Sequence, residues 1–294
     1  MPKYDKRRKY YMVLDCETAT LPCASKYTDE QRKSVAIAKP LIYDLGWQIV
    51  DKNGIVYHKV NYLITEIFSV PQIFNTAYYA EKRPIYLEKI KNGEITLVNW
   101  ETAITDLLAD LDVCEAVGAY NSMFDFKKAI PFTELYISKV YSADYQNWLN
   151  WQEKSAEWIA THKPNKESDG SFEECVFRFR GKAYPLFCLW GLSCKHLLNC
   201  VEYKQMCVDN EWNTASGKYF KTSAETAYRF LSKNADFIES HTALDDVIIE
   251  TLLFAEIVKR TKGRWELGIT HFPFRELGTT EDFENLGNFF RNNP

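Results

Sequence analysis

The chain has 294 residues and a formal net charge of −4, with 46% of its residues hydrophobic and 26% charged. This length and composition predict one large or two modest globular domains with a buried core. The net negative charge argues against a protein whose whole surface binds nucleic acid, although it allows a local basic track.

The sequence contains no run of about 18 apolar residues and no pattern typical of a secretory signal. The eight cysteines form no CxxC pair, which favours reduced thiols over a disulfide framework. We therefore expect a soluble, cytoplasmic protein.

Apolar strands and amphipathic helices alternate in the first half of the chain. An Asn53-Gly54 pair between two apolar runs is typical of a hairpin turn. The pattern predicts a strand at 10–15, a hairpin of 41–51 and 55–64, helices at 75–90 and 100–111, and a strand at 115–120.

The second half is less regular. Residues 142–170 combine a Trp-rich helical stretch with a polar loop, and the part of the chain after Lys262 receives no assignment. Further elements are expected as a strand or hairpin at 176–187, a helix at 189–198 and a long helix at 242–260. The alternation predicts an α/β sheet with helices packed on it.

The first acidic motif is DCET at 15–18, at the end of the first strand. Side chains alternate between the faces of a strand, so Asp15 and Glu17 project to the same side. Adjacent carboxylates repel one another unless a cation lies between them, and such oxygen ligands suit Mg²⁺ or Mn²⁺. Taken alone, the motif is better explained by two solvated acids at a strand end.

The second motif, NSMFD at 121–125, lies where an apolar strand gives way to a helix. Ser122 is a plausible N-cap, and Asp125 then lies in the first helical turn, where a negative charge favours the helix dipole. By itself this motif indicates only a helix start.

The third motif, HTALDD at 241–246, precedes the long helix. With Thr242 as the N-cap, Asp245 is a first-turn acid, whereas Asp246 has no capping role and lies one turn before Glu250. Five helical residues rotate about 140° out of line, so His241 is expected in the turn before the helix. Capping or packing is the simpler interpretation of a single histidine.

Together the motifs place Asp15, Glu17, Asp125 and Asp246 at element ends, where the sites of α/β sheets gather. Four carboxylates meeting there would be unfavourable without cations and favourable with two. Two bound cations can stabilise the attacking and leaving oxygens of a displacement at phosphorus. A histidine such as His241 is the right type of group to accept the proton of the attacking water.

In this order, DxE at 15–17, NxxxD at 121–125 and HxAxxD at 241–246 resemble the three motifs of the DEDDh 3′→5′ exonucleases. These DnaQ-like enzymes have a ribonuclease-H-like fold and include proofreading subunits and related DNases and RNases. The resemblance covers residues 9–260 and implies a mixed β-sheet flanked by helices in a single domain, 1–294. The stretch between the second and third motifs is longer than in minimal members, with an insertion near 142–184, and a tail at 261–294 follows the core.

The resemblance also implies two Mg²⁺ or Mn²⁺ ions and assigns roles to the motif residues. His241 would be the general base, and Thr18 and Phe124 would contact the terminal nucleotide. Asn121 is the first residue of the second motif and would also bind the substrate. The implied metal ligands, which are also catalytic residues, are Asp15, Glu17, Asp125 and Asp246.

Three basic groups are candidates for contacts with a nucleic-acid backbone. Lys127 and Lys128 follow Asp125 within about one helical turn. An N-terminal group is better explained by a solvated arm, and a group near 180 slightly better by a charged edge strand with aromatics on its other face. These two groups are Lys3, Lys6, Arg7, Arg8 and Lys9, and Arg178, Arg180 and Lys182.

Two further groups favour structural explanations. Trp148, Trp151 and Trp158 recur at helical spacing, which indicates core packing more than a base-stacking surface. Buried thiols explain the cysteines better than a zinc site, because their spacing is not that of a ribbon or finger. That group is Cys188, Cys194, His196, Cys200 and Cys207.

The sequence therefore predicts a metal-dependent 3′→5′ exonuclease that releases nucleoside 5′-monophosphates from single-stranded DNA, with a polymerase or replication protein as a possible partner. An exoribonuclease or oligoribonuclease with the same site is the nearest alternative, since a contact to the 2′-hydroxyl cannot be read from the sequence. A non-catalytic nucleic-acid-binding scaffold is an alternative of another class.

Overall fold

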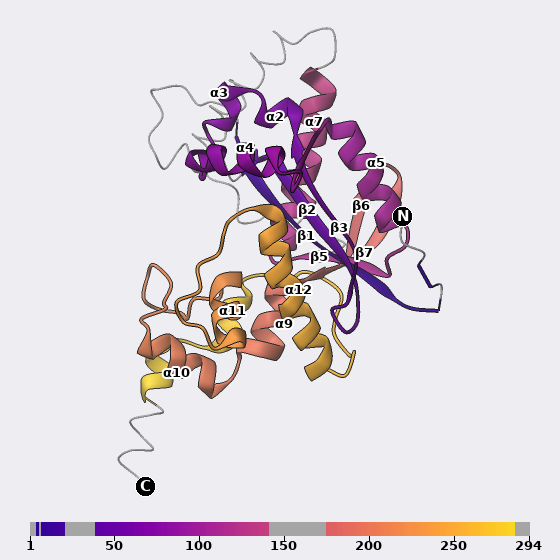
Figure 1. Ribbon diagram of the computed structural model, residues 1–294. Coiled ribbons are helices and arrows are strands. Elements are labelled where there is room, and N and C mark those ends of the chain that lie inside the picture. The colour runs from indigo at the N-terminus through magenta and orange to yellow at the C-terminus, as the bar shows by residue number, and fades with distance from the viewer. Residues whose placement is uncertain (1–3, 6, 21–38, 141–174, 286–294) are drawn as a thin grey trace.

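The computed structural model describes residues 4–5, 7–20, 39–140 and 175–285, and shows an α/β fold built on a seven-stranded mixed sheet (Figure 1). The strand order is β4-β3-β2-β1-β5-β7-β6. Neighbouring strands are antiparallel in β1–β2, β2–β3 and β6–β7 and parallel in β1–β5, β3–β4 and β5–β7. The strands are β1 (Tyr10–Ala19), β2 (Leu41–Asp51), β3 (Val56–Ile64), β4 (Thr96–Val98), β5 (Ala116–Ala119), β6 (Val176–Phe179) and β7 (Lys182–Cys188).

Helices cover both faces of this sheet. The helices between β3 and β4 are α2 (Thr65–Phe68), α3 (Pro71–Phe74), η1 (Ala80–Lys82) and α4 (Arg83–Lys91), and those between β4 and β6 are α5 (Trp100–Leu111), α6 (Ser122–Phe124), η2 (Asp125–Ala129) and α7 (Ile130–Val140). After β7 come α9 (Leu189–Ser193), η3 (Cys194–Leu198), α10 (Val201–Asp209), α11 (Ala224–Ser232), α12 (Ala243–Arg260) and η4 (Pro273–Leu277). No helix in these described ranges is long and apolar enough to cross a membrane.

The central strand β1 contributes to two hydrophobic cores, one on each face of the sheet. Met12 and Leu14 pack with residues of α5 and α7, whereas Val13 packs with residues of α9 and α12. Figure 1 shows α12 lying beside the sheet with α9 and α11 close to it. Because side chains alternate along a strand, Asp15 and Glu17 share the face of Val13, which is the α12 face.

Gly46 lets the start of α12 approach the sheet closely. It lies on β2 directly opposite Asp15. A Cβ atom at Gly46 would lie 2.6 Å from the backbone nitrogen of Leu244 in the first turn of α12. The absence of a side chain here therefore brings the first turn of α12, which contains Asp246, next to the acidic end of β1.

Substituting Gly46 with alanine is expected to lower the free energy of unfolding by about 1–3 kcal/mol, because the added methyl group must displace helix backbone. Urea unfolding followed by circular dichroism measures this change. An alanine variant as stable as the unsubstituted protein would contradict the close approach of α12 to β2.

Most of the elements expected from the sequence are confirmed. Both hairpins form, Gly54 occupies its turn with φ of 76°, and the helices at 100–111, 189–198 and 242–260 lie where they were expected. The first strand continues to Ala19, beyond the expected end at 15, because the whole segment pairs with β2.

The helix expected at 75–90 is wrong in its first half. The regular helix α4 begins only at Arg83, after a short 3₁₀ turn, with Pro84 in its first turn. Proline has no backbone N–H and fixes φ, so it is tolerated at the start of a helix and not in its interior. The prediction of a helix from residue 75 did not take Pro84 into account.

Parts of the expected insertion and tail can be located. Residues 142–174 of the insertion, including Trp148, Trp151 and Trp158, lie outside the described residues, as do residues 286–294 of the tail. The rest of the insertion forms the edge strand β6 and the start of β7. The described part of the tail returns to the sheet, where the N–H of Gly268 donates to the carbonyl of Leu186 at 2.7 Å.

Candidate active site

The residues of all three acidic motifs come together at the carboxyl ends of the central parallel strands β1 and β5. β1 and β5 are parallel neighbours, so the Asp15–Glu17 end of β1 meets the segment after β5 that carries Asp125. Ligand atoms of Glu17, His241 and Asp246 all lie within 4.8 Å of one another. Burial, followed by the charges of Glu250, Asp125, Asp246 and Glu17, raises the pKa of Asp15 well above its ordinary value.

Glu250 is a fifth carboxylate of this cluster, and the sequence motifs do not include it. It lies one helical turn after Asp246 on α12, and it is only 2% exposed. One carboxylate oxygen accepts a hydrogen bond from the N–H of Tyr120 at 3.2 Å. Burial, together with the charges of Asp125 and Asp246, raises its pKa well above the ordinary range.

Within the described ranges, no lysine or arginine forms an ion pair with any of these five carboxylates. Burial raises the pKa of Glu17, and the charge of Lys82 acts against this larger effect without forming an ion pair with Glu17. The Oδ1 atom of Asp246 is buried and has no hydrogen-bond partner, and Oδ1 of Asp125 accepts a weak bond from the thiol of Cys16 at 3.0 Å. Buried oxygens with unsatisfied capacity are a feature expected of ligands to hard divalent cations.

The raised pKa values of Asp125 and Asp246 show that the ionised forms of these carboxylates are unfavourable in this arrangement. Burial raises the pKa of Asp125 to about 7, although the Cys16 hydrogen bond opposes the shift. Burial, followed by the charges of Glu239, Asp245 and Asp44, raises the pKa of Asp246 to about 8. The cluster thus resists full ionisation near neutral pH unless positive charge enters it.

His241 lies in the turn before α12, as expected from the sequence, with a left-handed φ of 51°. Its ring stacks on Tyr79 with a centroid separation of 4.4 Å and an interplanar angle of 12°. Its Nδ1 lies 3.7 Å from a carboxylate oxygen of Glu239. These contacts on two sides fix the plane and direction of the imidazole ring.

Burial and the nearby Lys82 ammonium lower the pKa of His241. Lys82 is anchored at this point because Nζ donates to the carbonyl of Ser240 at 2.5 Å and lies 4.1 Å from the centre of the Tyr79 ring. The imidazole is therefore neutral at pH 7 and available to accept a proton.

The cap of α12 differs from the one expected. Thr242 is the N-cap residue by its backbone, but its hydroxyl donates to Oδ2 of Asp245 at 2.7 Å instead of accepting from the helix backbone. Asp245 also accepts from Lys89 of α4 at 2.7 Å. Asp44 of β2 satisfies the helix start, since its Oδ2 accepts from the N–H of Ala243 at 2.9 Å.

The expected N-cap role of Ser122 is also wrong. Ser122 is the first residue of α6, and Asn121 occupies the cap position without a side-chain hydrogen bond. The hydroxyl of Ser122 donates to the carbonyl of Phe187 at 2.6 Å and accepts from the N–H of Ala119 at 2.9 Å. These two hydrogen bonds link the segment that carries Asp125 to β5 and β7.

Most of the expected substrate-contact residues lie close to motif carboxylates in the chain. Thr18 follows Glu17 at an irregularity in the β1–β2 pairing, Asn121 is exposed, and Phe124 is half-buried next to Asp125. Lys128 is half-buried on the following turn. Lys127 points elsewhere, since its Nζ donates to the carbonyl of Val176 on β6 at 2.6 Å.

The basic residues near position 180 form ion pairs at the β6 edge of the sheet. Arg180 donates to the carboxylates of Glu101 and Glu134, with shortest distances of 2.8 and 3.0 Å, and Lys182 pairs with Asp112 at 2.5 Å. These contacts favour the charged edge strand over a nucleic-acid track. In the N-terminal group, Arg7 pairs with Asp5, Arg8 with Asp51 and Lys9 with Glu115, while Lys3 and Lys6 lie outside the described residues.

The cysteine-rich region does not gather into a ligand set. Cys188, Cys194 and Cys207 are buried free thiols, and Cys200 is half-buried. His196 instead pairs with Glu266 at 2.9 Å.

The sequence reasoning gave no role in the site to Asp44, Tyr79, Lys82, Glu239 and Glu250. Two of them had a signal: Glu250 shares a helical face with Asp246, and Asp44 is an acid within an otherwise apolar strand. The other three depend on tertiary packing.

Comparison of the sequence with models of known protein families gives no match, and comparison with curated proteins gives none either. The residues of the site therefore carry the functional argument.

Proposed function

We propose that this protein is a metal-dependent 3′→5′ exonuclease of the DEDDh type, built on a ribonuclease-H-like sheet. The observation that carries the proposal is the convergence of five carboxylates without a lysine or arginine partner among the described residues, next to an oriented, half-buried histidine. Asp15, Glu17, Asp125 and Asp246 would hold two Mg²⁺ or Mn²⁺ ions. When bound, these ions stabilise the negative charge on the attacking and leaving oxygens.

His241 removes a proton from the attacking water. The water oxygen forms the new bond to phosphorus, and the bond from phosphorus to the 3′ oxygen of the preceding nucleotide breaks. The leaving 3′ oxygen takes up a proton from solvent, so the shortened chain leaves with a 3′-hydroxyl, and the terminal nucleotide leaves as its 5′-monophosphate. Contact between Glu239 and Nδ1 directs the other ring nitrogen, Nε2, to this task.

The experiment that tests the proposal uses matched single-stranded DNA and RNA oligonucleotides labelled at the 5′ end, in Mg²⁺, Mn²⁺ or EDTA. A metal-dependent ladder that shortens from the 3′ end supports the exonuclease, and we expect DNA to be the faster substrate. Faster RNA hydrolysis would favour the exoribonuclease. Binding of both polymers without cleavage would contradict the proposal and favour the scaffold.

Replacing Tyr79 with alanine is expected to lower kcat about two- to tenfold with little change in KM. Stacking of the ring on His241 is worth about 0.5–1.5 kcal/mol, and 1.4 kcal/mol corresponds to about tenfold in rate. Tyr79→Phe keeps the ring and is the matched control. Equal rates for the alanine and phenylalanine variants would show that the ring does not position the histidine.

A further inference from the structure

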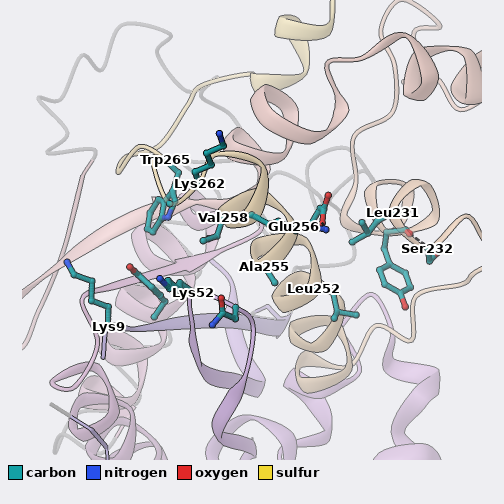
Figure 2. Close-up of a pocket in the computed structure, with 15 residues that line it drawn as sticks. Lys9, Lys52, Leu231, Ser232, Leu252, Ala255, Glu256, Val258, Lys262 and Trp265 are labelled. Atoms are coloured by element: carbon teal, nitrogen blue, oxygen red, sulfur yellow. Dashed lines mark hydrogen bonds and ion pairs between the residues drawn. The ribbon is translucent and has the colours of Figure 1, made fainter. Parts of the chain in front are cut away.

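A concave site lies at the opposite end of α12 from the carboxylates. It has a volume of about 990 Å³. We call it the lysine pocket, and its defining residues are Lys9, Tyr11, Lys52, Lys259, Lys262 and Trp265. Figure 2 shows Lys9 and Lys52 on one side of it and Lys262 and Trp265 on the other. The pocket thus combines residues from the start of β1, the β2–β3 turn and the end of α12.

The pocket carries an excess of positive charge. Its fifteen lining residues include four lysines and a single carboxylate, Glu256. The whole chain has a net charge of −4, so this excess is not a property of the average surface. A local positive potential of this kind attracts anions.

Two of the four lysines have ammonium groups available for a ligand. Lys9 pairs with Glu115 at 3.0 Å, and Lys259 pairs with Glu256 at 3.4 Å. Lys52 and Lys262 are exposed, and their side chains form no hydrogen bond or ion pair with a described residue. These two cations flank the pocket from different parts of the chain.

Favourable interaction with a helix dipole explains only part of this set. Lys259 and Lys262 lie at the C-terminal end of α12, where positive charge is stabilising. Lys9 and Lys52 belong to other elements and reach the same pocket through tertiary structure. Their convergence calls for another explanation.

Aromatic and apolar surface lines the same pocket. The half-buried Trp265 ring packs against Tyr11 at a centroid separation of 5.5 Å and against Phe254 at 5.6 Å, which fixes its orientation. Leu252 on α12 is 45% exposed. Proteins that bind single-stranded nucleic acids combine such stacking surfaces with cations that follow the backbone.

We propose that the lysine pocket binds single-stranded nucleic acid upstream of the 3′ end held at the carboxylates. This inference rests on the proposed function. Asp246 and Lys259 are thirteen residues apart on α12, or about 20 Å at 1.5 Å per residue. A stacked strand covers this distance in about six nucleotides at ~3.4 Å each.

The test compares the unsubstituted protein with a Lys52→Ala/Lys262→Ala variant. Binding of a 5′-fluorescein 20-nucleotide strand is followed by fluorescence anisotropy in EDTA at several KCl concentrations. We expect the Kd to rise on the order of tenfold, and the slope of log K against log salt to become shallower by about 1.4, which is ~0.7 for each lost phosphate contact. A Lys91→Ala/Lys218→Ala variant, with the same charge change at exposed sites outside the pocket, should match the unsubstituted protein.

A 20-nucleotide Kd and salt slope unchanged by the pocket substitutions would overturn the inference, as would a failure of the unsubstituted protein to bind the strand. Thermal melting checks that each variant is folded. In a separate arm with Mg²⁺, a four-nucleotide strand, too short to reach the pocket, should be hydrolysed equally by all three proteins. No hydrolysis there would refute the proposed function, while the anisotropy in EDTA would still decide the role of the pocket.

Discussion

Replacing Asp246 with asparagine is expected to abolish hydrolysis, with a loss on the order of 10³-fold or more, while the protein melts at the same or a higher temperature in EDTA. The substitution removes one ionisable carboxyl group from a buried cluster whose members raise one another's pKa values. It should therefore relieve repulsion in the absence of cations and weaken a metal site at the same time. Initial rates on labelled oligonucleotides and thermal melting curves measure the two effects.

Asp245→Asn is the matched control, since it makes the same chemical change at the neighbouring residue. Asp245 faces Lys89, Thr242 and Ser240 instead of the carboxylate cluster. Its substitution weakens a partly exposed ion pair and should cost about 1 kcal/mol of stability or less, with activity retained. Equal loss of activity in both variants would contradict the separate roles assigned to these two acids.

The thermal stability of the protein in EDTA is expected to fall as the pH rises from about 5 to 8. The folded-state pKa values of Asp125 and Asp246 are about 7 and about 8, well above the ordinary 3.8. The pKa of each aspartate is higher in the folded than in the unfolded state. Its contribution to the free energy of unfolding is therefore full below pH 3.8 and is lost as the pH rises through the folded-state pKa. The pKa of His241 is lowered, so this residue makes the stability rise with pH up to about pH 6.5. This is the effect of one group against the two aspartates.

A difference of one pKa unit between the folded and unfolded states corresponds to about 1.4 kcal/mol of the free energy of unfolding. A loss of a few kcal/mol of this free energy should lower Tm by several degrees. Added Mg²⁺ or Mn²⁺ should restore more stability at pH 8 than at pH 5.5, since cations bind the ionised carboxylates and stabilise the folded state. The Asp125→Asn/Asp246→Asn variant should show a flatter pH dependence and little response to cations. A Tm that rises with pH in EDTA would be inconsistent with this account.

The sequence predicted the parts of the fold that depend on local patterns. The apolar segments of β1 and β5 and the apolar face of α12 were recognisable because each follows the period of its own structure. The alternation along β1 also placed Asp15 and Glu17 on one face, which the packing of Val13 identifies as the α12 face. The meeting of the three motifs could be expected because strand ends gather at one edge of an α/β sheet.

The features that were missed depend on contacts between distant segments. Ser122 and Thr242 were expected to cap their own helices, but Ser122 bonds to Phe187, and Asp44 from β2 caps α12. A local cap motif cannot reveal that a partner from another strand competes for the same hydrogen bond. The contact of Tyr79 with His241 joins residues 162 positions apart, and no local pattern connects them.

The most direct measurement of the central claim is the number of Mn²⁺ ions that the carboxylate cluster binds. The protein is stripped with EDTA, dialysed and titrated with Mn²⁺, and the free ion is followed by electron paramagnetic resonance with a nucleoside 5′-monophosphate present. We expect two bound ions per chain, and both should be lost from the Asp15→Asn/Asp246→Asn variant while binding is retained by Asp245→Asn. An unsubstituted protein that binds no Mn²⁺, or binding that survives the loss of Asp15 and Asp246, would contradict a metal-dependent active site at this position.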